Sequence, residues 1–178
     1  FLCQTDFPEY AERVSRAIPG IRRVWLTGDT RVPGEESAAG ALIDAHLGRT
    51  VPNAPVQWDS VCWLFFTSGT TGRPKAAVLT HGQMGFVITN HLCDLMPGTT
   101  EDDVSLVVAP LSHGAGIHAL AQVARGAASV LLSGERLDCE EAWQLVERHR
   151  VSNMFTVPTI LTMLTRHAAV DRVDHSSL

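Results

Sequence analysis

The sequence predicts an α/β protein with a mostly parallel sheet flanked by helices. Short apolar runs of strand length alternate with longer segments of helical periodicity along the chain. Residues 104–109 are almost continuously apolar, as expected for a strand that is covered on both faces. A strand near Leu2, a helix from Pro8 to Ile18 and a strand at 24–26 form a β-α-β unit, which is typical of a parallel sheet. With 178 residues, 45% of them hydrophobic, the chain has enough material for one domain with its own core.

Residues 6–55 are predicted to contain one clear helix, a polar loop, a short helix and a turn-rich connection. Pro8 lies in the first turn of the predicted helix, and Asp6 is its candidate N-cap. A loop rich in glycine, proline and charged residues follows at 28–40, and a short helix is expected at 41–47. A turn-rich connection at 50–55 leads to the next strand.

The loop 67–75, with the sequence TSGTTGRPK, lies between the apolar runs 61–66 and 76–79. This pattern predicts a strand, a tight polar connection and a second strand. Two glycines allow backbone amides to turn toward a ligand, four hydroxyls add donors, and Lys75 adds a positive charge. Such a loop suits a polyanion, most plausibly the phosphates of a nucleotide. It is not a Walker A loop, since two residues separate the glycines, and an ordinary hairpin turn is the alternative interpretation.

The second half of the chain predicts alternating helices and strands. Thr80–Gln83 fits a capping box, and the helix that follows carries an apolar stripe up to Met96. The strand at 104–109 leads into Pro110–His113, which places His113 just beyond a strand's carboxyl end, where open α/β sheets bind ligands. The remaining expected elements are a helix at 117–124, a buried strand at 129–132, a helix capped by Asp138 and running to 150, a strand at 153–157 and a helix at 158–167.

Composition and spacing exclude several classes of function. The net charge is −5 and there is no basic tract, which argues against nucleic acid as a partner. No apolar run approaches the roughly 18 residues of a membrane span. The four cysteines show no CxxC or metal spacing, and they are interpreted as reduced core residues of a cytoplasmic protein. No metal ligand is predicted: His113 and His118 are not spaced for zinc, and His91 is interpreted as a core-edge histidine.

Three segments carry a resemblance to a known family. Phe66–His81, FTSGTTGRPKAAVLTH, resembles the phosphate-loop signature of the adenylate-forming superfamily, which includes acyl-CoA and aryl-CoA synthetases, luciferases and the adenylation domains of nonribosomal peptide synthetases. Pro110–Gly116 resembles the family's Pro-Leu-x-His segment beside the acyl pocket, and Val157–Thr159 resembles a later Val-Pro-x segment. Ala76 departs from the pattern, because the family usually has glycine after the lysine.

The resemblance is strongest to acyl-CoA synthetases, or fatty-acid–CoA ligases, and implies their reaction. ATP activates a carboxylic acid as an acyl-adenylate with release of pyrophosphate, and the thiol of coenzyme A then displaces AMP. The resemblance assigns Lys75, Thr71 and His113 to catalysis and His113, Gly114 and Gly116 to the substrate pocket; Mg²⁺ and coenzyme A are implied by it alone. The residues that would hold the ATP phosphates are Thr67, Ser68, Gly69, Thr70, Thr71, Gly72 and Lys75.

The resemblance also implies a domain organisation. Residues 1–178 would form part of an N-terminal AMP-binding domain, with the first βαβ unit and a linker in 1–58 and the phosphate loop and part of the acyl pocket in 59–178. The family's ribose-binding, Mg²⁺-binding and C-terminal catalytic motifs do not occur in the chain, so the isolated chain is expected to be inactive. Two alternatives stay open: an adenylation domain that loads a carrier protein, and a non-catalytic nucleotide- or phosphate-binding module. The expected partners are a small carboxylic acid, ATP and coenzyme A, and a homodimer stays open.

Overall fold

A computed structural model describes residues 2–4, 7–21, 25–27, 38–67, 72–134 and 136–178 of the chain. The chain divides into two compact units, Phe1–Pro55 and Val56–Leu178. In the first unit, β1 (Leu2–Gln4) and β2 (Trp25–Thr27) pair in parallel. They are connected through α1 (Pro8–Ala17), and the predicted β-α-β unit is therefore confirmed.

The helices of the first unit differ from the predictions at their ends. Pro8 is in the first turn of α1, as predicted, but Phe7 occupies the N-cap position without a side-chain cap. The candidate cap Asp6 lies outside the described residues. The second helix, α2 (Ala38–His46), begins three residues before the predicted start and takes up the end of the predicted loop. Residues 28–37 of that loop are outside the described part of the chain.

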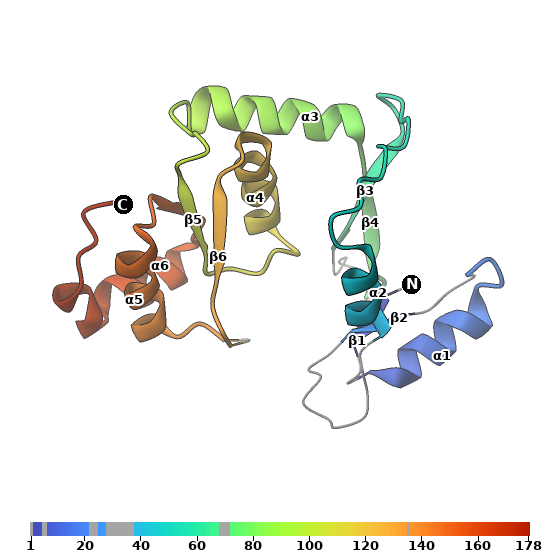
Figure 1. The fold of residues 1–178 in the computed structure, drawn as a ribbon, viewed down its shortest axis with the longest axis horizontal. Helices are drawn as coiled ribbons and strands as arrows, with labels where there is room; N and C mark the ends of the chain where they lie inside the picture. The colour runs from blue at the N-terminus through green and yellow to red at the C-terminus, as the bar shows by residue number, and fades with distance from the viewer. Residues whose placement is uncertain (1, 5–6, 22–24, 28–37, 68–71, 135) are drawn as a thin grey trace. The chain divides into compact units, whose positions relative to one another are not determined.

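The second unit begins with an antiparallel hairpin (Figure 1). Strands β3 (Val61–Thr67) and β4 (Lys75–Thr80) pair from Val61↔Thr80 to Thr67↔Lys75, with an irregularity between Val61 and Trp63. The predicted strand, polar connection and strand are thus confirmed. Most side chains of the hairpin are exposed.

The helix after the hairpin begins with the predicted capping box. In α3 (His81–Asn90), the Thr80 hydroxyl accepts from the Gln83 amide at 3.2 Å, and the Gln83 side chain accepts from the Thr80 amide at 2.9 Å. The helix was predicted to continue as one α-helix to Met96. Instead it passes at His91 into a π-helical turn, η1 (His91–Leu95), which the Met96 amide closes on the His91 carbonyl at 2.9 Å.

A three-stranded parallel sheet forms the centre of the second unit. The order is β6 (Ala128–Leu131), β5 (Val104–Val107) and β7 (Asn153–Met154). The buried central strand β5 confirms the prediction for the run at 104–109. The prediction that 129–132 is a buried strand is wrong: β6 lies at the sheet's edge in the described part of the chain, and Leu131 is 61% exposed.

Helices cover the sheet and complete the core. They are α4 (Gly114–Arg125), α5 (Cys139–His149) and α6 (Pro158–Arg166), followed by the 3₁₀ turn η2 (Ala168–Arg172). The buried core groups strand residues with helix residues, and the indole of Trp143 donates to the Leu164 carbonyl at 3.0 Å, which joins α5 to α6. The members of this core are Leu106, Val108, Ala142, Trp143, Val146, Val151, Leu164 and Ala169.

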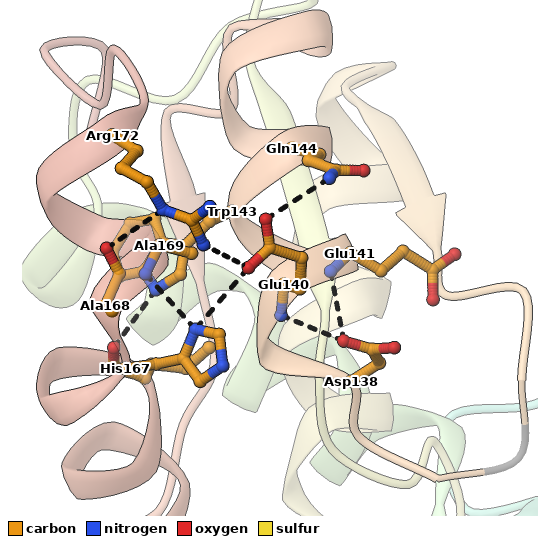
Figure 2. Close-up of polar contacts among 10 residues, drawn as sticks. Asp138, Glu140, Glu141, Trp143, Gln144, His167, Ala168, Ala169 and Arg172 are labelled. Carbon is orange, nitrogen blue, oxygen red and sulfur yellow. Dashed lines mark hydrogen bonds and ion pairs between the residues drawn. The ribbon is translucent and has the colours of Figure 1, made fainter.

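The start of α5 is fixed by side-chain contacts (Figure 2). Asp138 accepts from the amides of Glu140 and Glu141 at 2.9 and 3.2 Å, as the predicted N-cap should. Glu140 forms an ion pair with Arg172, which ties α5 to η2. His167 Nδ1 lies 4.0 Å from the same carboxylate and accepts from the Ala169 amide at 3.3 Å, which caps η2.

Two sequence-based expectations about burial and membranes can be compared with the structure. Of the four cysteines, Cys3 is buried and Cys139 half-buried, whereas Cys62 and Cys93 are exposed. The prediction that all four cysteines are core residues is therefore wrong for Cys62 and Cys93, which lie on solvent-exposed positions of β3 and η1. None of the helices in the described ranges has the length and apolar character needed to cross a bilayer.

Candidate functional site

The two ends of the predicted phosphate loop are brought together by the hairpin. Thr67 ends β3 and Lys75 begins β4, and the two residues are direct partners in the ladder. The Thr67 hydroxyl donates to the Lys75 carbonyl at 3.5 Å, and Gly72 has a φ of +75°, in the left-handed region that favours glycine. The loop is therefore closed at its base by the backbones of Thr67 and Lys75.

Four of the predicted phosphate-binding residues cannot be placed. Ser68, Gly69, Thr70 and Thr71 lie outside the described residues, so their contacts to phosphate stay a prediction. Thr67, Gly72 and Lys75 are described, and the Lys75 side chain is exposed, as a group that meets a charged ligand requires.

His113 occupies the N-cap position of α4, beyond the end of β5, where the sequence placed it. Its amide donates to the Pro110 carbonyl at 3.1 Å, and its carbonyl accepts from the Gly116 amide at 2.9 Å. The His113 ring lies 6.0 Å from the ring of Phe65, with an angle of 54° between the planes. Since Phe65 lies on β3 two residues before Thr67, this contact brings the histidine next to the base of the loop.

Gly114 and Gly116 are placed where a side chain would meet other parts of the protein. A Cβ on Gly114 would lie 2.6 Å from the Phe155 ring. A Cβ on Gly116 would lie 2.1 Å from the Leu111 carbonyl oxygen and 3.1 Å from the Trp63 ring. These two glycines allow α4 to approach its neighbours closely, and their contact with substrate stays a prediction.

An apolar cavity of about 480 Å³ opens at the carboxyl ends of β5 and β6. Pro110 and Leu111, which precede His113, line one side, and Arg136 is the cation among its lining residues. His113, Gly114 and Gly116 are not part of its lining. Its position agrees with the general rule that α/β sheets bind ligands beyond their strand ends. The other residues around it are Val107, Val108, Ala109, Leu131, Leu132, Gly134, Leu137 and Ile160.

A second, polar hollow of about 720 Å³ lies beside the start of α5. It includes Cys139, Asp138 and His167. Burial, and then the charge of Asp138, raise the pKa of the Cys139 thiol above its usual value, which disfavours a thiolate nucleophile. Within the described ranges, no three histidine, cysteine or acidic side chains come together in a way that could hold a metal ion.

Comparisons with known proteins give the family. The model of the AMP-binding enzyme family matches residues 8–178. The chain belongs to the AMP-binding enzyme family. Its similarity to the N-terminal domain of FACL13 from Mycobacterium tuberculosis covers 99% of this chain and 42% of that one, with a TM-score of 0.74 at 21% identity. The fold of this AMP-binding chain is thus that of the N-terminal part of such enzymes.

Named relatives of this AMP-binding chain are CoA ligases. A feruloyl-CoA synthase of Amycolatopsis sp is 38% identical over 149 residues, which covers 79% of this chain and 30% of the relative. A 4-coumarate-CoA ligase of Narcissus pseudonarcissus is 32% identical over 168 residues, covering 92% of this chain and 30% of the relative. The chain therefore spans about 30% of the length of these relatives.

Several residues near the site were not predicted as functional. Phe65 and Trp63 read as ordinary members of a strand, and Phe155 as a member of a later one. Their contacts with His113, Gly116 and Gly114 join segments that are far apart in the chain. The alternating aromatic residues Trp63 and Phe65 before the loop are visible in the sequence, but this pattern does not predict which residues they contact.

Proposed function

We propose that the protein to which this chain belongs is an AMP-forming acid–thiol ligase. It joins a carboxylic acid to the α-phosphate of ATP, with release of pyrophosphate, and then transfers the acyl group to the thiol of coenzyme A, with release of AMP. The observation that carries this proposal is the TSGTTGRPK loop of an AMP-binding family member, set at the closed end of a hairpin with Thr67 and Lys75 paired at its base.

In this proposal the loop holds the β- and γ-phosphates. The Lys75 ammonium and the loop's amides and hydroxyls, with Thr71 among them, neutralise charge that develops as the α-phosphate is attacked. Gly72 can turn its amide toward the ligand because its left-handed backbone carries no Cβ. Mg²⁺ enters only as a family expectation, since the described residues supply no cluster for it.

The carboxylic acid is proposed to bind beyond the carboxyl end of β5, near His113. The contact between Phe65 and His113 supports this proposal, because Phe65 lies on β3, the strand that leads into the proposed phosphate loop, and the acid must meet ATP there. Gly114 and Gly116 belong to the same turn. The relatives named as feruloyl-CoA synthase and 4-coumarate-CoA ligase favour an aromatic acid over a fatty acid, and coenzyme A over a carrier protein as acceptor. A cytoplasmic location remains part of the proposal.

ATP–pyrophosphate exchange with the intact protein tests the activity. A panel of cinnamic, benzoic and fatty acids should show exchange with at least one aromatic acid, and coenzyme A should then yield the thioester and AMP. Absence of exchange with every acid, under conditions where the protein binds ATP, would favour the non-catalytic nucleotide-binding alternative.

Replacing the loop lysine tests its role. Lys75→Ala should lower the exchange rate by about 10²–10³-fold, because a charge aimed at the phosphates is lost. Thermal stability should change little, because the side chain is exposed. Arg73→Ala, at an exposed cation two residues earlier, is the matched control and should have a much smaller effect on rate. Parallel losses of rate and stability in Lys75→Ala would make the lysine structural.

Replacing the histidine tests the acid site. His113→Ala should alter the KM or the rate for the acid while leaving the KM for ATP nearly unchanged. Ser112→Ala, at the exposed neighbouring residue, is the control. Identical kinetics for wild type and His113→Ala across several acids would remove His113 from the site.

A further inference from the structure

A series of buried and partly buried hydrogen bonds joins η1, α4, β7 and β5. His91 Nε2 lies 3.1 Å from His118 Nδ1. His118 Nε2 lies 2.9 Å from Asn153 Oδ1 and 3.2 Å from Ser105 Oγ. Ser105 is 2% and His118 7% exposed, so both polar groups depend on these partners. The proposed chemistry uses none of these residues.

The hydrogen bonds at the Asp103 end of this series fix the direction of donation in the others. Ser152 Oγ lies 2.6 Å from Asp103 Oδ1, and because an ionised carboxylate only accepts, the serine hydroxyl donates to it. The Ser152 oxygen is then an acceptor for Asn153 Nδ2 at 3.2 Å. This orients the Asn153 amide with its oxygen toward His118, so His118 Nε2 carries the hydrogen and donates.

The histidine pair continues the same direction. A neutral His118 that is protonated on Nε2 has no hydrogen on Nδ1, so Nδ1 accepts from His91 Nε2. Every hydrogen bond in the series from His91 to Asp103 is therefore donated in the direction of Asp103. A protonated His118 would carry hydrogens on both ring nitrogens and could no longer accept from His91. The series is complete only while His118 is neutral.

Burial favours the neutral state of His91. The pKa of His91 is lowered from its usual 6.5, first by burial and then by His118, which faces it from α4. From the start of β5, Asp103 contributes a negative charge at the far end, and the hydrogen bond from Ser152 is the main reason that the pKa of this carboxyl is low. On α4, the Arg125 guanidinium donates to the Thr99 carbonyl at 2.9 Å, and Asp94 on η1 is exposed.

We propose that His118 is a positioning residue that fixes α4 on β5 and β7. It acts through this series of hydrogen bonds, which we call the His118 relay (His91, His118, Asn153, Ser152 and Asp103). His113 immediately precedes α4, five residues from His118, so the relay also sets the place of His113 beside the phosphate loop. The link to acid binding rests on the proposed function, whereas the relay's effect on stability does not.

The lowered pKa of His91 gives the stability of the fold a pH dependence of known sign. The unfolded chain takes up a proton near pH 6.5, before the folded chain does. The stability of the fold is therefore complete above that pH and decreases as the pH falls through the lower pKa of the folded state.

Thermal unfolding of the intact protein at about pH 7.5 and about pH 5.5 tests this sign. His91→Gln keeps a donor for His118 Nδ1 but cannot take up a proton. Wild type should lose more in Tm than His91→Gln over this pH range. His149→Gln, at an exposed histidine on α5, is the control and should behave as wild type. An identical pH response in wild type and His91→Gln would overturn the neutral state assigned to His91.

Exchange kinetics of the intact protein test the positioning role. His118→Phe keeps a ring but removes all three hydrogen bonds of the histidine, and it should raise the KM for the acid about tenfold while the KM for ATP stays within about threefold. His91→Gln should retain the wild-type KM at about pH 7.5. If His118→Phe does not fold, His91→Phe takes its place, and a smaller rise in the acid KM is expected.

Two outcomes separate this inference from the proposed function. A folded His118→Phe with unchanged acid KM, or with both KM values raised equally, overturns the positioning role even if the enzyme is active. If wild type catalyses no exchange with any acid, the proposed function fails. The unfolding comparison between wild type and His91→Gln then still tests the partly buried, neutral state of His91, which does not depend on catalysis.

Discussion

The hairpin β3–β4 and the sheet β6–β5–β7 are built in different ways although they belong to the same unit. In the hairpin, Leu64 is 49% and Val78 54% exposed. Hydrogen bonds between the two strands therefore stabilise the hairpin more than a hydrophobic core does. In the sheet, Leu106 on β5 is 1% exposed and packs against the helices. The strands that flank the proposed ATP-binding loop thus make few buried contacts, so substitutions on them should cost less stability than substitutions in the sheet.

The largest expected effect distinguishes the two regions directly. Leu106→Ala should lower the free energy of unfolding by about 2–5 kcal/mol, because it leaves a cavity in a packed core. Leu64→Ala, the same change in the hairpin, should cost less than about 1 kcal/mol, because the side chain is half exposed already. Urea unfolding measures both. Equal losses would show that the hairpin is as tightly packed as the sheet.

A second pair of variants compares the helix after the hairpin with the helix on the sheet. Gly116→Ala in α4 should destabilise the fold by about 1–3 kcal/mol, since the new methyl group would meet the Leu111 carbonyl and force a shift. Gly85→Ala in α3 has open space around the new Cβ and should stabilise by about 0.5–1 kcal/mol. The free energies of unfolding decide this, and a stabilising Gly116→Ala would contradict the close approach of α4.

A smaller effect is expected at the cap of α5, on the sheet side of the comparison. Asp138→Ala should cost about 1 kcal/mol, because two amides at the start of the helix lose their acceptor. Asp138→Asn retains an acceptor and should remain close to wild type. Thermal unfolding of the two variants side by side checks this, and an equal loss would assign the effect to charge instead of capping.

The smallest effect is expected at the ion pair between Glu140 and Arg172 (Figure 2). Both side chains are more than a third exposed, and solvent screens their attraction. Glu140→Gln should therefore change the free energy of unfolding by less than about 1 kcal/mol, and the difference should shrink as salt is added. A larger, salt-independent loss would show that the pair contributes to packing between α5 and η2.

The sequence by itself determined the local features of this protein. The capping box at Thr80 and the cap at Asp138 depend on contacts between near neighbours, and the structure has them as predicted. Residue patterns also predicted the strands of a parallel sheet, although β6 is exposed and β7 covers only Asn153–Met154 of the predicted 153–157. The pairing of Thr67 with Lys75 likewise follows from two short strands around a turn. The position of His113 beyond β5 follows from the strand before it.

Only the tertiary structure decided which distant segments meet. The exposure of β6 depends on its place at the edge of the sheet, and the π-helical turn at His91 was hidden in a continuous helical pattern. The pairing of His91 with His118 and the contact of Phe65 with His113 join residues on separate elements. Local residue patterns do not predict such contacts, because the contacts depend on how helices and strands that are distant in the sequence pack together.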